Sequence, residues 1–196
     1  IYGFESHPYD ALLEGFERGA TTKSIEELFE ALKKPLREIG EVAKNKSYDV
    51  PANIMNSDYT IESQMAFNRE VAKSFGFDFD AGRIDTAVHP FCSGLAPGDT
   101  RMTTRYDEAN FMSSLYGILH ETGHGLYEQG LPSEHFSCPV GKAVSLGIHE
   151  SQSRLWENHV GRSRGFWEKW YPRAEVIFPS IKQIGFDAVL GYCHRS

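Results

Sequence analysis

The sequence predicts a mainly α-helical protein with a small β-sheet, and three observations lead to this fold class. The N-terminal third has a helical pattern, apolar residues recur at helical spacing from Phe111 to Leu126, and only two short segments near the middle are rich in β-formers. The composition, with 40% hydrophobic and 24% charged residues, is typical of a globular protein. No internal repeat, low-complexity tract or linker is visible, which predicts one domain, or a piece of one.

The N-terminal elements carry no obvious chemistry. We expect a short amphipathic helix over 9–18 and a longer one over 24–46, where a serine followed by a glutamate three residues later is typical of a capping box. Pro35 inside the longer helix predicts a kink or a break. A third helix is expected over 60–75, where it is ended by Gly76.

The two short segments predict strands over 85–91 and 101–106, paired with each other. On a strand, the side chains of Asp99, Arg101 and Thr103 would face the same side. This row could donate to peptide carbonyls or bind a carboxylate through the guanidinium group. Alternatively, Asp99 and Arg101 form an internal salt bridge that only holds the strand, and both interpretations stay open.

The most informative stretch is the run from His120 to His124, with the sequence His-Glu-Thr-Gly-His. Two histidines four residues apart lie on one face of a helix and can bind one divalent metal ion. Glu121 lies beside that ion and can deprotonate a water molecule. The pattern predicts a hydrolase that attacks with water; the alternative is a surface helix that carries two histidines by chance.

The surroundings of this motif favour a buried helix. It is expected to begin at Asp107, with acidic residues in its first turn, and to end at Gly130, where glycine and proline follow. Gly123 and Gly125 add little bulk, so a second backbone could approach this helix closely.

A catalytic zinc ion needs a third protein ligand, which should come from another element. The expected returning helix over 144–160 carries Glu150, which is our candidate for this ligand. His149 is a rival, although it points about 100° away around a helix. An ordinary pair between Glu150 and Arg154, four residues apart, is the structural alternative.

Four motifs together resemble a known family, the thermostable carboxypeptidase Taq or M32 metallopeptidases. They occur in the family's order and read His89-Pro90-Phe91, Asp99-Thr100-Arg101-Met102-Thr103-Thr104, His120-Glu121-Thr122-Gly123-His124 and His149-Glu150-Ser151-Gln152-Ser153-Arg154. The resemblance covers only the middle of the longer family chain. The family's arginine-containing and tyrosine-rich segments, which recognise the substrate carboxylate, are not matched here, and Gly191-Tyr192 is not carried over.

The resemblance implies a helical, gluzincin-type metallopeptidase fold with a small sheet beside a long active-site groove. It implies a metal-dependent carboxypeptidase and a homodimer. It carries over His120, His124 and Glu150 as metal ligands and Glu121 as general base and acid. The single partial domain would comprise a helical wall, short strands, the metal-binding helices and C-terminal helices, over 1–80, 81–106, 107–160 and 161–196.

The same motifs suggest substrate contacts and leave alternatives. We expect His89, Asp99, Arg101 and Thr103 to contact a peptide, although His89 could instead pack behind Pro90. An endopeptidase or oligopeptidase using the same centre, and a non-catalytic fragment whose metal only joins two helices, are the alternative functions. The expected cofactor is one divalent ion, Zn²⁺ or else Co²⁺, because the same ligands suit both.

The net charge and the cysteine content indicate which partners and which cellular compartment to expect. The net charge of −7 argues against nucleic acid and anionic membranes as partners. No apolar run approaches the roughly 20 residues of a membrane helix, and no targeting segment is visible. We therefore expect a cytoplasmic protein. Its three cysteines, Cys92, Cys138 and Cys193, should be free thiols. The aromatic cluster of Trp167, Trp170 and Tyr171 should belong to the hydrophobic core.

Overall fold

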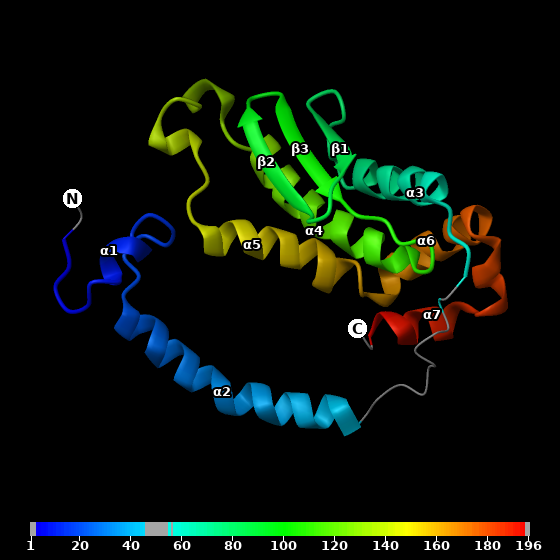
Figure 1. The fold of residues 1–196 in the computed structure, drawn as a ribbon, viewed down its shortest axis with the longest axis horizontal. Helices are drawn as coiled ribbons and strands as arrows, with labels where there is room; N and C mark the ends of the chain where they lie inside the picture. Colours follow the sequence, from blue (N-terminus) through cyan, green and yellow to red (C-terminus); the bar gives the residue numbers. More distant parts are fainter. Residues whose placement is uncertain (1–2, 46–54, 56, 195–196) are drawn as a thin grey trace. The chain divides into compact units, whose positions relative to one another are not determined.

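The computed structural model describes residues 3–45, 55 and 57–194, and Figure 1 shows its helices and strands. The predicted fold class is confirmed, because helices dominate and one three-stranded sheet accompanies them. Two compact units are present: one contains 1–49 and 145–147, and the other contains 50–144 and 148–196. That the whole chain forms a single partial domain stays a prediction. Among the described residues, no helix combines the length and apolar character needed to cross a membrane.

The first unit contains α1 (Asp10–Leu13) and α2 (Thr22–Asn45). The helix predicted over 9–18 is thus reduced to four residues. The predicted capping box is also wrong, because the reciprocal pair lies three residues earlier. The backbone N–H of Ser24 donates to Thr21 Oγ1 at 3.1 Å, and the N–H of Thr21 donates to Ser24 Oγ at 3.0 Å.

Helix α2 continues through Pro35, so a break there is excluded, and a kink at Pro35 stays a prediction. Proline removes one hydrogen bond from a helical ladder, and a helix of 24 residues keeps the others. No residue of α2 is buried in this structure, although its sequence carries many apolar side chains. Lys46, near the predicted end of this helix, lies outside the described residues.

The second unit is built on α3 (Ile61–Ser74) and α4 (Phe111–Gln129), which pack against each other. Helix α3 lies within the predicted span 60–75, and Thr60 is its N-cap, since its hydroxyl accepts from the Ser63 N–H at 3.3 Å. Helix α4 ends at Gly130 as predicted but begins later than Asp107. Asn110 is its cap, with Oδ1 accepting from the Met112 N–H at 3.1 Å, so the two acidic residues precede the helix.

The sheet consists of β1 (Gly82–Thr86), β2 (Phe91–Ala96) and β3 (Asp99–Thr104), in the order β1-β3-β2. β1 pairs with β3 in parallel, with Asp85 opposite Thr103, and β2 pairs with β3 antiparallel. A continuous strand over 85–91 was therefore a wrong prediction. The chain leaves the sheet after Thr86 and re-enters it at Phe91, so His89 and Pro90 lie in a connection.

Helix α4 lies between the sheet and the other helices and forms the centre of this unit (Figure 1). Its apolar residues enter two buried clusters, one toward the sheet and one toward the C-terminal helices. Trp167 is fully buried, and Trp170 and Tyr171 are nearly so, which confirms their prediction as core. Further helical segments are η1 (Ser133–His135), η2 (Pro139–Gly141), α6 (Arg164–Ile177), η4 (Pro179–Gln183) and α7 (Phe186–Cys193).

The returning helix is α5 (Leu146–Arg154), followed directly by a six-residue π-helix, η3 (Leu155–Val160). Its backbone approaches α4 at Gly123, as predicted. A Cβ on Gly123 would lie only 2.6 Å from Ser153 Cα, a distance that real Cβ atoms do not show. The same prediction was wrong for Gly125, which instead faces the Phe77 ring and the Met102 sulfur on the sheet side.

Candidate metal centre

Helices α4 and α5 bring two histidines and a glutamate together. One ligand atom from each of His120, His124 and Glu150 lies within 4.8 Å of the other two. Glu150 Oε2 is 3.4 Å from His124 Nε2 and 3.8 Å from His120 Nε2. Tetrahedral zinc ligands at about 2.1 Å from the ion lie about 3.4 Å from one another. The three donors, two imidazoles and one carboxylate, therefore fit a divalent ion in both type and spacing.

Glu121 lies next to this group and is buried, with 4% of its surface exposed. Within the described residues, its Oε2 atom has no hydrogen-bond partner. Burial is the main reason that the pKa of Glu121 rises to about 7, while the neighbouring His120 acts in the opposite direction. A buried polar atom without a partner is costly, and such atoms are rare in proteins unless they serve a site.

His120 is held from its other side by a glutamate that the sequence analysis did not identify. His120 Nδ1 donates to Glu157 Oε2 at 2.9 Å, which leaves Nε2 facing Glu150. This hydrogen bond is the main reason that the pKa of His120 is raised and that of Glu157 is lowered. Glu157 lies seven residues after Glu150, which is close to two helical turns, so both side chains share one face of a helix. This spacing was the sequence signal that could have identified Glu157.

His124 has a different neighbour on its Nδ1 side. Its Nδ1 atom lies 2.6 Å from Nδ1 of His149, and His149 Nε2 lies 2.7 Å from Glu128 Oε1. Burial, followed by the two neighbouring histidines, lowers the pKa of His124 to about 4, so the ring is neutral near pH 7. Among the described residues, the metal-sized group does not include His149, the rival ligand, which faces Glu128 instead.

The contacts of Glu150 are compatible with both sequence interpretations. Its Oε1 atom accepts from Arg154 Nε at 2.9 Å, which is the expected pair between residues four apart. Its Oε2 atom faces the imidazoles of His120 and His124. The ion pair thus orients the carboxylate without removing the oxygen that completes the three-atom group.

A cavity of about 540 Å³ opens beside Glu121 and His120. His89, Tyr116 and Arg162 are among the residues that line it. Tyr192, which the sequence analysis set aside, also lines it, with its hydroxyl accepting from Asn110 Nδ2 at 2.8 Å. The site therefore has room for a ligand directly against the buried Glu121 carboxyl.

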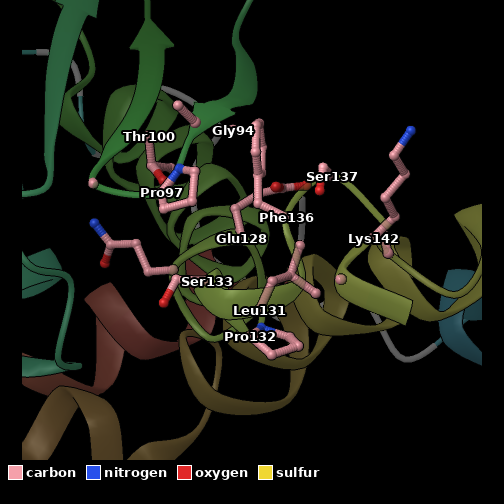
Figure 2. A pocket seen from close by; sticks show the side chains of 15 residues that line it. Gly94, Pro97, Thr100, Glu128, Leu131, Pro132, Ser133, Phe136, Ser137 and Lys142 are labelled. Atoms are coloured by element: carbon pink, nitrogen blue, oxygen red, sulfur yellow. The ribbon is translucent and has the colours of Figure 1, made fainter. Parts of the chain in front are cut away.

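A second cavity of about 540 Å³ lies at the other end of α4, where the β2–β3 hairpin meets η1 and η2 (Figure 2). Its walls include the apolar side chains of Leu131, Pro132 and Phe136. The Glu128 side chain lies at its centre, between Gly94 and Leu131 (Figure 2). Since Glu128 also contacts His149, this cavity shares a residue with the surroundings of His124.

The predicted row on β3 divides into two parts. Arg101 donates to Asp99 from Nε at 2.8 Å and from a terminal nitrogen at 2.9 Å, and this pairing lowers the pKa of Asp99. Both side chains are substantially exposed, and they line neither of the two cavities. Thr103 is buried, and its hydroxyl donates to the His89 carbonyl at 3.2 Å. The structure therefore brings His89 to Glu121, and it pairs Asp99 with Arg101.

The fold and this site define the chain as a helical protein with a metallopeptidase type of centre. The family model described as carboxypeptidase Taq (M32) metallopeptidase matches residues 1–192. The chain therefore belongs to the M32 metallopeptidase family, as the four motifs predicted.

Relatives of this family match over nearly the whole chain. Thermostable carboxypeptidase 1 of Thermus thermophilus is 46% identical over 179 residues, which are 91% of this chain and 35% of the relative. A solved M32 carboxypeptidase from Deinococcus radiodurans has a TM-score of 0.88 at 35% identity, covering 94% of this chain and 37% of the other. A carboxypeptidase of Pyrococcus furiosus has a TM-score of 0.89 at 36% identity, covering 97% and 39%. The chain thus spans little more than a third of these relatives.

Proposed function

We propose that this protein is a metal-dependent carboxypeptidase that releases C-terminal amino acids from peptides. One observation carries the proposal: a buried glutamate, Glu121, has a carboxyl oxygen that no described residue pairs with, directly beside a metal-sized group of two histidines and a glutamate. Membership of the M32 family and the names of the relatives support the same reaction class.

We assign one divalent ion to His120, His124 and Glu150, with Zn²⁺ preferred and Co²⁺ as the alternative. When bound, such an ion would acidify a water molecule and polarise the carbonyl of the scissile bond. Both histidines offer Nε2 and keep Nδ1 for a hydrogen bond, which is how proteins usually orient imidazole ligands.

Glu121 is the general base and acid in this proposal. Its carboxylate takes a proton from the attacking water and then delivers it to the leaving amine. A carboxyl group whose pKa lies near the working pH can do both, and the burial of Glu121 supports this assignment. The cavity beside Glu121 would hold the residues around the scissile bond.

The proposed substrate contacts differ in their support. His89 lines the cavity beside Glu121, and the Thr103 hydroxyl donates to the backbone carbonyl of His89. Both residues therefore belong to the proposed substrate region. Asp99 and Arg101 stay a prediction as substrate contacts, because their mutual ion pair equally favours a structural role.

Other parts of the proposal concern the setting of the protein. We propose a cytoplasmic homodimer that acts on peptides and not on nucleic acid or membranes. The net charge of −7 supports the last point, and the low, odd number of widely spaced cysteines, Cys92, Cys138 and Cys193, supports a reducing compartment. Light scattering of the purified protein tests the dimer.

A pair of peptides that differ only at the C-terminus tests the reaction. The intact protein, loaded with Zn²⁺, should release the last residue from a peptide with a free carboxylate and leave the amidated peptide uncut. Equal cleavage of both peptides at internal bonds would identify an endopeptidase instead. Metal binding without any cleavage would support the non-catalytic alternative.

A further inference from the structure

Three polar side chains connect the metal group to the far end of α4. His124 Nδ1 contacts His149 Nδ1 at 2.6 Å, and His149 Nε2 contacts Glu128 Oε1 at 2.7 Å. His124 and Glu128 lie one turn apart on α4, and His149 of α5 bridges them. All three side chains are largely buried, with 17 to 21% of their surface exposed. We call these three residues the relay.

The proton positions in the relay follow from its last member. An ionised carboxylate can only accept hydrogen bonds, so His149 Nε2 must carry a hydrogen and donate it to Glu128. A neutral His149 then has a bare Nδ1, which accepts from the Nδ1–H of His124. A neutral His124 in turn has a bare Nε2, which is the atom that faces Glu150 at 3.4 Å.

We propose that Glu128 and His149 are positioning residues, which hold His124 in the tautomer that presents the Nε2 lone pair to a metal ion. This inference rests on the proposed function, because His124 is assigned there as a ligand. The opposite direction of the relay would place a hydrogen on His124 Nε2 and block that lone pair. Neither Glu128 nor His149 enters the three-atom group, so both act through His124.

Gly94 on β2 makes room for Glu128, the last member of the relay. A Cβ on Gly94 would lie 2.8 Å from Cδ and 3.1 Å from Cγ of Glu128, and closer still to Oε2. Figure 2 shows Gly94 next to this side chain. Since Glu128 is flexible and the strand backbone is not, any side chain at position 94 must displace the carboxylate. The substitution Gly94→Ala therefore tests the relay without changing a relay residue.

Metal affinity measures the function of the relay. We would titrate Co²⁺ against a competing chelator in the intact protein and record the cobalt absorption spectrum. His149→Leu should weaken Co²⁺ binding by about 10- to 100-fold and change the spectrum. His149→Asn, whose amide oxygen can still accept from His124, should recover most of the affinity. Equal losses in both variants would overturn the proposal, because a purely structural role does not depend on the acceptor.

A double substitution separates the relay from general damage to the fold. Gly94→Ala should weaken Co²⁺ binding in the native background and have no further effect when Glu128 is already alanine. Additive losses would show that Gly94 acts by another route and would overturn its place in the relay. Circular dichroism of each variant checks that the helices are retained.

Nitrogen-15 NMR of the metal-free protein provides a measurement that needs neither metal nor variants. The relay requires the Nε2–H tautomer for His149 and the Nδ1–H tautomer for His124. The reversed tautomers would overturn the proposal. If the expected tautomers are found but the native protein binds no Co²⁺, the relay stands as a hydrogen-bonded unit and the proposed metal-dependent function fails.

Discussion

The α4–α5 helix pair and strand β3 both carry charged residues that the sequence singled out, and the two regions use them differently. On the helix pair, three potential ligand atoms converge, and a buried carboxyl oxygen of Glu121 has no partner among the residues that the structure describes. On β3, Asp99 and Arg101 satisfy each other in an exposed ion pair. The difference teaches that a buried polar atom left unsatisfied is better evidence for chemistry than a charged row whose members already pair.

The largest effect on activity should come from replacing Glu121 on the helix pair. Glu121→Gln removes the base, so kcat should fall by about 10²- to 10⁴-fold while the metal content stays unchanged. Stopped assays on a short peptide, together with metal analysis, measure both quantities. Glu134→Gln, at an exposed site in η1, is the matched control and should retain activity. Retained hydrolysis in Glu121→Gln would remove Glu121 from its role.

The next effect concerns the convergence of the ligand atoms. Glu150→Gln replaces an anionic ligand by a neutral amide, so Zn²⁺ affinity should fall by more than about 100-fold, beyond the loss typical of residues that only orient ligands. Competition with a chelator of known affinity measures it. An unchanged zinc stoichiometry under that challenge would exclude Glu150 as a ligand.

The crossing of the two helices is the third test. Gly123→Ala places a methyl group against the α5 backbone at Ser153, which should cost about 1–3 kcal/mol of unfolding free energy and weaken metal binding. Denaturant unfolding measures the loss. Gly165→Ala is the control, because a Cβ on Gly165 meets no atom within 4 Å. Equal stability of the two variants would mean that the crossing is not tight.

The smallest effect should be found on β3. Asp99→Asn and Arg101→Gln break an exposed pair, so kcat/KM should change by no more than about twofold. Peptide hydrolysis at several substrate concentrations separates KM from kcat. A rise in KM well beyond this limit would instead support the predicted substrate contact and bring the two regions closer in function.

Local patterns predicted the helix pair well because helical spacing determines which side chains share a face. The four-residue spacing of His120 and His124 was sufficient to place both rings together. The contacts of His149 and Glu128 depend on how α5 lies against α4, and no local pattern contains that crossing, while for Glu157 on η3 the spacing from Glu150 was the only signal. For the same reason, the sequence left a metal ligand and an ion-pair partner of Arg154 as alternatives for Glu150, whereas in the structure Oε2 faces the two imidazoles and Oε1 contacts Arg154.

The sheet was harder to predict than the helices. Threonine, valine and aromatic residues around position 88 predicted a continuous strand, but β-propensity does not distinguish a strand from an extended connection. Pairing with β3 decides the matter: the Ala87 N–H still donates to the Thr104 carbonyl at 2.9 Å, but residues 88–90 have no register partner on β3. The capping error at α2 is similar, since Thr21 and Ser24 offered a competing pair of polar side chains.

The tight approach at Gly123 has a consequence for metal selectivity. Because backbone touches backbone there, no side-chain rotamer sets the spacing of the two helices that carry the three donors. Calcium prefers six to eight oxygen donors at about 2.3–2.6 Å, whereas this group offers two imidazole nitrogens and one carboxylate. The centre should therefore discriminate against calcium by the type and number of its donors, and millimolar CaCl₂ should leave bound Co²⁺ undisturbed in an absorption titration.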